Sequence, residues 1–220
     1  MKDILIICNG EKLNKTILQF LLKDRIILCC DGGVNQILPY HEPDYVIGDM
    51  DSIANNINLS SEKIIPIKEQ DSSDLEKMLS WIIERQWERK KIIIVSMTGK
   101  RSDFSFYNLH LLRKYKDLNI TVVDKKFIIQ LVSQNVVLAH VPENAIISLL
   151  PLTEVENVTT TGLKFPLKNQ NLIPGQVESI SNASISEQIH IHLDQGLLLL
   201  FLEYKNLKSL KDITISTENK

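Results

Sequence analysis

Acidic residues recur in this sequence directly after short apolar runs. Asp31 follows the apolar run 25–30, and Asp49 and Asp51 follow the run 44–47. After the runs 63–67 and 91–96 come, respectively, Asp71 with Asp74, and Asp103 with the basic residue Arg101. Carboxylates from separate loops repel one another when they converge, unless a cation lies among them. Oxygen ligands without His or Cys favour Mg²⁺, which proteins commonly share with substrate phosphates. The pattern therefore predicts a magnesium site that binds a nucleotide.

Arginine and glycine residues near these acids add to the nucleotide hypothesis. Arg101 offers a planar fork that matches a phosphate, and Gly32, Gly33 and Gly48 allow tight turns and close backbone approach. Neither the P-loop pattern nor the dinucleotide fingerprint is present, so metal, arginine and loop amides would have to hold the phosphates. Each acidic loop by itself is an ordinary turn or helix cap. Their recurrence at four successive strand ends is what favours a functional site.

The elements that must position these residues alternate between strands and helices. Strands are expected at 4–8, 25–30, 44–47, 63–67, 91–96 and 119–123, and helices at 73–89 and 104–115. Ser73 with Glu76 forms a capping-box start for the first of these helices, and Asp103 is the expected N-cap of the second. The alternation predicts a doubly wound parallel α/β sheet, in which ligands bind at the carboxyl edge of the strands.

The second half of the sequence has a different character. Short strand-like runs occur at 127–132, 136–140, 145–150, 155–160, 163–167, 176–180, 189–193 and 197–204. These closely spaced runs predict a C-terminal β-sandwich, with no helix of useful length. From Asn206 onward we expect a polar, frayed tail. The predicted domains are therefore 1–125, an α/β domain, and 126–220, a β-sandwich.

Composition excludes several classes of protein. The 220 residues carry 25 basic and 27 acidic side chains, a net charge of −2, which is no footprint for nucleic acid or an anionic membrane surface. No apolar run is long enough to span a membrane, and the start has no signal-peptide core. Three cysteines without metal-type spacing favour a reduced, cytoplasmic setting.

At the acidic loops the sequence resembles the thiamine pyrophosphokinase family. The motifs that carry the resemblance are, in order, Asp31-Gly32-Gly33-x-Asn35, Gly48-Asp49-x-Asp51-Ser52, Gln70-Asp71-x-Ser73-Asp74, Arg101-x-Asp103, and Thr161-Gly162-Leu163-Lys164-Phe165-Pro166-Leu167 followed by Ser179-Ile180-Ser181-Asn182. Each motif is modest. Five in this order, spanning nearly the whole chain, are specific.

The resemblance implies an enzyme that transfers the diphosphate of ATP to the hydroxyl of thiamine with Mg²⁺, releasing AMP. It also implies a homodimer with its site between subunits. The residues that it assigns to ATP are Asp31, Asp49, Gln70, Ser73 and Arg101; to Mg²⁺, Asp49, Asp51 and Asp74; to catalysis, Asp51, Asp74, Arg101 and Asp103; and to thiamine, Ser181 and Asn182. Asp74 and Asp103 are both candidates for the group that accepts the hydroxyl proton.

The sequence departs from the family pattern in the arginine loop and after the Ser-Asn pair. Ser96 and Lys100 stand where glycines are usual, and Phe104 replaces a histidine. Some members have an aromatic residue soon after the Ser-Asn pair, where this chain has 183–185, Ala-Ser-Ile. Two alternatives stay open at this point. One is a pyrophosphokinase for another alcohol such as a pterin, and the other is a non-catalytic homologue that binds thiamine or nucleotide.

Overall fold

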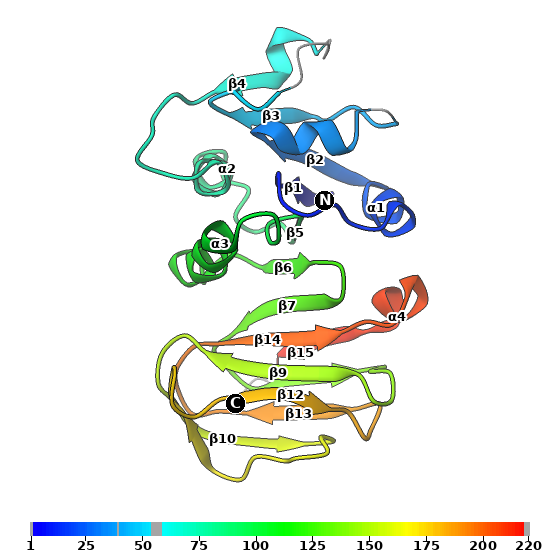
Figure 1. The fold of residues 1–220 in the computed structure, drawn as a ribbon, viewed down its shortest axis with the longest axis vertical. Coiled ribbons are helices and arrows are strands. Elements are labelled where there is room, and N and C mark those ends of the chain that lie inside the picture. Colours follow the sequence, from blue (N-terminus) through cyan, green and yellow to red (C-terminus); the bar gives the residue numbers. More distant parts are fainter. Residues whose placement is uncertain (1, 39, 54–58, 218–220) are drawn as a thin grey trace. The chain divides into compact units, whose positions relative to one another are not determined.

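The computed structural model describes residues 2–38, 40–53 and 59–217, which form two compact units (Figure 1). Unit 1 comprises residues 1–125 and unit 2 residues 126–220. Among the described residues, no helix is both long and apolar enough to cross a lipid bilayer.

The centre of unit 1 is a parallel sheet. Its strands are β1 (Asp3–Ile7), β2 (Arg25–Cys30), β3 (Tyr45–Gly48), β4 (Ile64–Pro66), β5 (Ile92–Val95) and β6 (Ile120–Val123). They lie in the order β6-β5-β1-β2-β3-β4, and every pair is parallel. After β4 the chain therefore crosses back to the other side of β1, which places a topological switch point between β1 and β5. Ligands of such sheets bind beyond the strand ends at this point.

The sheet of unit 1 is apolar because its central strands are buried on both faces. Residues 4–7 of β1 and three of the four residues of β5 have no exposed surface. The surrounding helices are α1 (Lys15–Leu21), the 3₁₀ helix η1 (Asp31–Gln36), the 3₁₀ helix η2 (Ser61–Lys63), α2 (Asp74–Glu84) and α3 (Ser102–Lys114). A continuous run of Ile and Val thus becomes a two-sided core, as the sequence predicted.

The helix boundaries differ in part from the sequence predictions. Ser73 does cap α2, since its hydroxyl accepts a hydrogen bond from the Glu76 N–H at 3.3 Å. The helix ends at Glu84, five residues short of the prediction, close to Gln86 with its φ of 59°. Asp103 was wrongly predicted as the N-cap of α3: Arg101 is the N-cap residue, and Asp103 lies in the first turn.

Unit 2 is built from antiparallel strands, the arrangement expected of a β-sandwich. One sheet has the order β12-β9-β14-β7 and the other β11-β10-β13-β8-β15. The strands are β7 (Phe127–Val132), β8 (Val136–Ala139), β9 (Ile146–Pro151), β10 (Val155–Thr161), β11 (Gln170–Leu172), β12 (Ser179–Ala183), β13 (Ile189–His192), β14 (Leu198–Glu203) and β15 (Thr214–Thr217).

Two sequence predictions for unit 2 are wrong. The run 163–167 is not a strand: Leu163 forms only an isolated bridge to Ser184, and the strand on this side is β11, further along. The tail after Asn206 is not frayed over its described part. Asn206 and Ser209 form a capping box that begins α4 (Leu207–Asp212), and β15 then pairs with β8. The capping box and the pairing with β8 order this segment, although its polar composition suggested a frayed tail.

Candidate active site

Three carboxylates from two strand ends converge in unit 1. Asp31 follows β2, Asp49 and Asp51 follow β3, and one oxygen from each lies within 4.8 Å of the others. The backbone arranges them: the Asp51 N–H donates to Asp49 Oδ1 at 3.3 Å, and the Ser52 N–H donates to Asp31 Oδ2 at 3.1 Å. We call Asp31, Asp49 and Asp51 the acidic cluster.

Glycine at position 48 permits this approach. Gly48 has a φ of 154°, and a Cβ atom there would lie 2.7 Å from Asp31 Cβ and 3.2 Å from Asp74 Oδ1. Asp31 and Met50 also adopt positive φ, 37° and 70°. Non-glycine residues in such conformations concentrate at functional sites, where the surrounding structure holds the strain.

Burial, hydrogen bonds and neighbouring charges act differently on the pKa values of three acids in this region, Asp31, Asp49 and Asp74. Burial raises the pKa of Asp31, against the hydrogen bonds that it accepts. Burial also raises the pKa of Asp74, with a smaller contribution from the charges of Asp31 and Asp49 and an opposing one from Lys77. Hydrogen bonds from the Asp51 backbone and from Gln70 lower the pKa of Asp49. The local environments therefore shift the pKa values of these aspartates in different directions, although the side chains are chemically identical.

Lys77 is a site residue that the sequence reasoning missed. Its side chain is only 3% exposed, and its Nζ lies 3.5 Å from Asp74 Oδ1, one turn earlier on α2. This deeply buried ammonium compensates part of the negative charge of Asp74 and also lowers the pKa of Asp49. The spacing of three residues between Asp74 and Lys77 on the predicted helix is a signal that could have identified it.

Arg101 and Asp103 lie together at the exposed side of this region. Two hydrogen bonds join them, Nε to Oδ1 at 3.1 Å and Nη2 to Oδ2 at 2.5 Å, and the Arg101 side chain is 66% exposed. The guanidinium also stacks over the Phe104 ring, with 4.3 Å to the ring centroid. The hydrogen bond to Arg101 lowers the pKa of Asp103. Arg101 is thus held by two neighbours and still open to a ligand.

The loop between β5 and α3 adopts a conformation that suits glycine. Ser96 has a φ of 55° and Lys100 a φ of 46°. The Ser96 hydroxyl donates to Gln36 Oε1 at 3.0 Å, and Lys100 Nζ donates to Asn9 Oδ1 at 3.0 Å. Asn9 is a second residue that the sequence reasoning passed over, although it follows the first predicted strand. Side-chain hydrogen bonds accompany the left-handed backbone at both positions.

Two adjoining pockets contain all the predicted site residues of unit 1. The inner pocket, about 390 Å³, lies at the ends of β1 and β5, and the outer pocket, about 670 Å³, lies over the loop before α2. Both are lined by Ser52, Ser73, Asp74, Arg101 and Phe104. Asp31 lines the inner pocket, whereas Asp49, Asp51, Gln70 and Asp103 line the outer one. The inner pocket coincides with the switch point of the sheet, and the outer pocket adjoins it beyond the ends of β3 and β4.

The donor set of the acidic cluster fits a hard divalent cation. Its ligand atoms are carboxylate oxygens only, the preference of Mg²⁺. Asp31 Oδ1 is buried and has no hydrogen-bond partner among the described residues, although a buried carboxylate oxygen is costly to leave unpaired. The cluster contains Asp31, whereas the sequence analysis assigned Asp74 to the metal together with Asp49 and Asp51.

The two residues predicted to contact thiamine lie on β12 of unit 2. Ser181 is exposed, has a φ of 56°, and donates its N–H to Ser148 Oγ at 2.9 Å. Asn182 is only 4% exposed. Its Oδ1 accepts from the Phe165 N–H at 3.1 Å, and its Nδ2 donates to the Phe165 carbonyl at 2.7 Å. Asn182 thus fixes the backbone of Phe165, whose side chain is 64% exposed.

Comparison with known proteins now decides the family. The model for the thiamin pyrophosphokinase catalytic domain matches residues 17–123, and the model for the thiamin pyrophosphokinase vitamin B1 binding domain matches residues 133–198. The thiamine pyrophosphokinase of Bacillus subtilis is 32% identical, over 72% of this chain and 77% of its own. Thiamine pyrophosphokinase 2 of Arabidopsis thaliana is 30% identical, over 79% of this chain and 76% of its own.

The chain belongs to the thiamine pyrophosphokinase family. The crystal structure of thiamine pyrophosphokinase from Bacillus subtilis superposes with a TM-score of 0.80 at 26% identity, covering 93% of this chain and all of that one. Thiamin pyrophosphokinase from Candida albicans shares the fold, with a TM-score of 0.77 at 21% identity, over 93% and 89% of the two chains. The resemblance found in the sequence motifs is therefore confirmed, and so is the predicted fold class.

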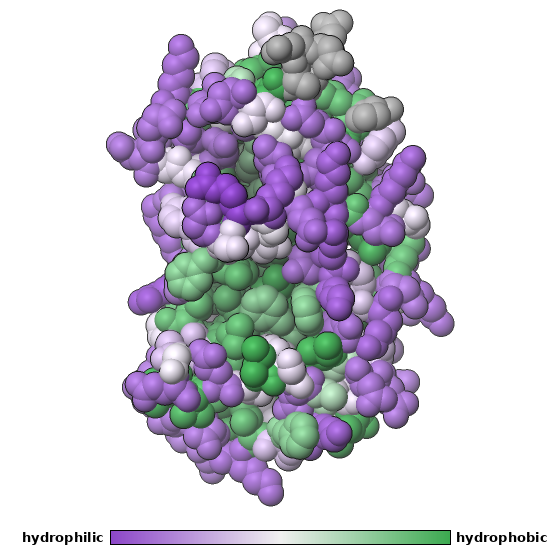
Figure 2. All heavy atoms as spheres, viewed as in Figure 1, coloured by the Kyte–Doolittle hydropathy of each residue, from purple (hydrophilic) through white to green (hydrophobic). Residues whose placement is uncertain are grey.

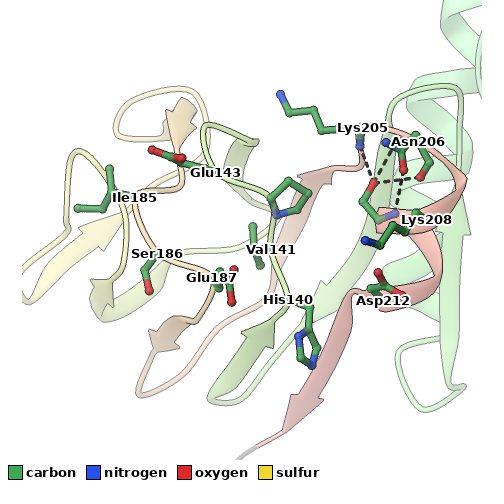
Figure 3. Close-up of a pocket in the computed structure, with 12 residues that line it drawn as sticks. His140, Val141, Glu143, Ile185, Ser186, Glu187, Lys205, Asn206, Lys208 and Asp212 are labelled. Atoms are coloured by element: carbon green, nitrogen blue, oxygen red, sulfur yellow. Dashed lines mark hydrogen bonds between the residues drawn. The ribbon is translucent and has the colours of Figure 1, made fainter.

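A third cavity in this member of the thiamine pyrophosphokinase family lies apart from every predicted site residue. It has about 820 Å³ and opens in unit 2 beside α4, as Figure 3 shows. Acidic and basic side chains line it together: Glu143, Glu187 and Asp212 face the same space as Lys205 and Lys208. The hydrogen bonds drawn there join residues 205 and 206 to Ser209 and belong to the cap of α4. Nothing in this lining supports the transfer chemistry of the family.

Proposed function

We propose that the inner and outer pockets of unit 1 bind ATP with Mg²⁺ and transfer its terminal diphosphate to the hydroxyl of thiamine. The family gives the reaction: an O–P bond forms at the β-phosphorus, the bond from that phosphorus to the bridging oxygen of AMP breaks, and AMP leaves. The observation that carries the proposal is the acidic cluster beyond the ends of β2 and β3, with its unpaired, buried Asp31 Oδ1.

The acidic cluster would hold the cation. Asp31, Asp49 and Asp51 present oxygens within 4.8 Å of one another, and these three residues would hold one divalent ion. Bound Mg²⁺ would neutralise phosphate charge and polarise the phosphoryl oxygens. Gln70, which lies 3.3 Å from Asp49 Oδ2, keeps that carboxylate oriented.

Cationic side chains would stabilise the transferred diphosphate. Arg101 stands between the two pockets, stacked on Phe104, and its planar fork can bind two phosphate oxygens. Lys100 also lines the inner pocket, where its hydrogen bond to Asn9 Oδ1 positions the ammonium group. Charge that develops on the phosphoryl oxygens is then met by donors already in place.

Asp74 is the group that we infer to accept the proton of the thiamine hydroxyl. Both oxygens of Asp103, the other candidate, are engaged by Arg101. Asp74 uses one oxygen in its ion pair with Lys77 and lines both pockets. A general base must reach the reacting hydroxyl with a lone pair that no other group occupies.

Unit 2 would supply the thiamine contacts. The vitamin B1 binding domain model covers Ser181, Asn182 and Phe165 alike. Ser181 is exposed and can meet the substrate directly, whereas Asn182 would act by holding Phe165 in place. An aromatic face suits a cationic thiazolium.

Unit 2 also presents the surface on which we expect a homodimer to form. Figure 2 shows apolar side chains gathered over β7, β14 and β9. Phe127 and Phe201 pack edge to face on neighbouring strands there, and both are partly exposed. Apolar patches of this kind mark contact surfaces. A shared active site and a cytoplasmic setting remain part of the proposal.

One incubation tests the function. Purified protein with ATP, Mg²⁺ and thiamine should release AMP and thiamine diphosphate in equal amounts, and EDTA should abolish both. A hydroxymethyl pterin in place of thiamine should release no AMP above background. Release of AMP with the pterin alone would overturn the choice of acceptor, and thiamine binding without AMP release would overturn catalysis.

A further inference from the structure

The inner pocket has walls that the phosphate chemistry does not use. Cys8, Cys30, Leu75 and Met97 line it, each at most 5% exposed. The hydrogen bond with Cys8, and then burial, raise the pKa of the Cys30 thiol. Sulfur and aliphatic groups form an apolar slot next to Asp31. A pocket of about 390 Å³ is within the size range of small-molecule sites.

One polar side chain in this slot lacks a partner. Asn108 of α3 lines the inner pocket and is 6% exposed. Its Nδ2 donates to the Met97 carbonyl at 2.8 Å. This bond fixes the orientation of the amide and leaves Oδ1 as the atom that can accept a hydrogen bond from a ligand. Within the described ranges, nothing donates a hydrogen bond to Asn108 Oδ1. A buried amide oxygen of this kind is normally paired, so a ligand that brings a donor is expected.

We propose that the inner pocket takes the adenine base of ATP and that Asn108 Oδ1 accepts a hydrogen bond from its exocyclic amino group. The inference rests on the proposed function. The same pocket contains Asp31 of the acidic cluster, so a triphosphate held there leaves its base within reach of the apolar slot. Met97 and Leu75 offer apolar contact to a purine. The amide oxygen selects a purine that carries an amino group at this edge.

The choice of adenine makes a prediction about nucleotide selectivity. A 6-oxo purine turns an acceptor toward Asn108 Oδ1, and a purine without a 6-substituent leaves that oxygen unpaired. A site built around a hydrogen bond rejects ligands that cannot form it. Asn108 is therefore a specificity residue for the base, with no role in the transfer step.

The first experiment needs no variant. Calorimetric titration of the wild-type protein with Mg²⁺ and no thiamine should give a dissociation constant for ATP at least about tenfold lower than for ITP or purine riboside triphosphate, the factor that one buried hydrogen bond commonly supplies. Equal affinity for the three nucleotides, or binding of none, would overturn the inference.

The second experiment separates recognition from structure. Asn108→Leu should weaken ATP at least about tenfold and leave ITP within about twofold, so that the selectivity disappears. Ser105→Ala is the matched control: its hydroxyl bonds the Gly99 N–H at 3.0 Å and the Arg101 carbonyl at 2.8 Å, tying α3 to the same loop outside the pocket. It should keep the ATP-to-ITP ratio. If Asn108→Leu weakens both nucleotides equally, or weakens thiamine alone, Asn108 does not read adenine.

The two proposals fail in different ways. Selective ATP binding that depends on Asn108, without AMP release in the presence of thiamine, contradicts the proposed transfer and leaves the adenine pocket standing. AMP release with no nucleotide selectivity contradicts the adenine pocket alone.

Discussion

The Asp31 carboxylate accepts a hydrogen bond from the backbone N–H of Ser52 at 3.1 Å, and so joins the loop after β2 to the loop after β3. Its other oxygen is buried and has no partner among the described residues. The same side chain thus organises the acidic cluster and keeps one oxygen for a cation.

Asp31→Asn should stabilise the metal-free protein and abolish its response to Mg²⁺. Asparagine still accepts from Ser52, but it removes a buried charge. Because the folded pKa of Asp31 is raised, its ionised form costs stability above that pKa, and the cost vanishes below the unfolded value. Without Mg²⁺, the substitution should therefore raise Tm at pH 7 by about 2–4 °C for each kcal/mol that it adds to the free energy of unfolding. This gain should shrink as the pH falls toward 4.

Adding Mg²⁺ at about one hundred times its dissociation constant should stabilise the wild type by about 2.7 kcal/mol and this variant far less. Asp117→Asn, an exposed acid, is the control and should respond as the wild type does. An undiminished Mg²⁺ response of Asp31→Asn would exclude Asp31 from the metal site.

Arg101→Ala should lower kcat about 10²–10³-fold, the usual effect of removing one preorganised donor from a charged transition state. Arg101→Lys should restore little, because an ammonium neither stacks on Phe104 as a plane nor forms a two-pronged contact. Steady-state AMP release measures both. Arg113→Ala, an exposed arginine on the same helix, should keep wild-type turnover; similar losses in both alanine variants would remove Arg101 from the mechanism.

The variant Lys100→Gly should be more stable than Lys100→Ala, the reverse of the usual order for glycine and alanine. The φ of 46° disfavours any side chain by about 1–2 kcal/mol, and both substitutions lose the same hydrogen bond to Asn9. Urea unfolding should place Lys100→Gly above Lys100→Ala by about 1 kcal/mol. At Lys116, which is not among the residues with positive φ, alanine should be the more stable of the pair. The same order at both positions would contradict the strain.

Glu76→Gln should destabilise unit 1 in a pH-dependent way. Hydrogen bonds from Lys114, at 2.5 Å, and from Tyr107 lower the pKa of this nearly buried carboxylate. A lowered folded pKa adds stability above the unfolded value near 4.3, and this stability is lost as the pH falls through the folded pKa. We expect a loss of about 1–3 kcal/mol at pH 7, from urea unfolding, that disappears in strongly acidic solution. A loss that does not change with pH would mean that packing, and not charge, is responsible.

Asn182→Ala should raise the KM for thiamine and leave the KM for ATP within about twofold. It removes both hydrogen bonds that hold Phe165 and should cost about 1–3 kcal/mol of stability. Asn171→Ala in the same unit also loses a bond to a backbone N–H, that of Asn157 at 3.1 Å, and should leave both KM values unchanged. If ATP and thiamine are affected alike, Asn182 serves only the fold.

Sequence alone determined the parallel sheet and the acids at its edge. Continuous runs of Ile and Val are buried only when both faces of their strands are covered, as in a parallel sheet. The carboxyl ends of parallel strands lie at the same edge of the sheet, whatever the details of packing. The ordered motifs then sufficed to identify the family. Ser73 as a helix cap followed from local chemistry, which needs no long-range contact.

The tertiary structure alone decided how these residues divide their roles. The acidic cluster contains Asp31, because Gly48 lets the end of β2 approach β3, whereas Asp74 turns to the buried Lys77. Asn182 proved to be committed to Phe165, and Asn108 to carry an unpaired oxygen. Such assignments depend on which side chain meets which across separate elements, and spacing along the chain contains no record of those distances.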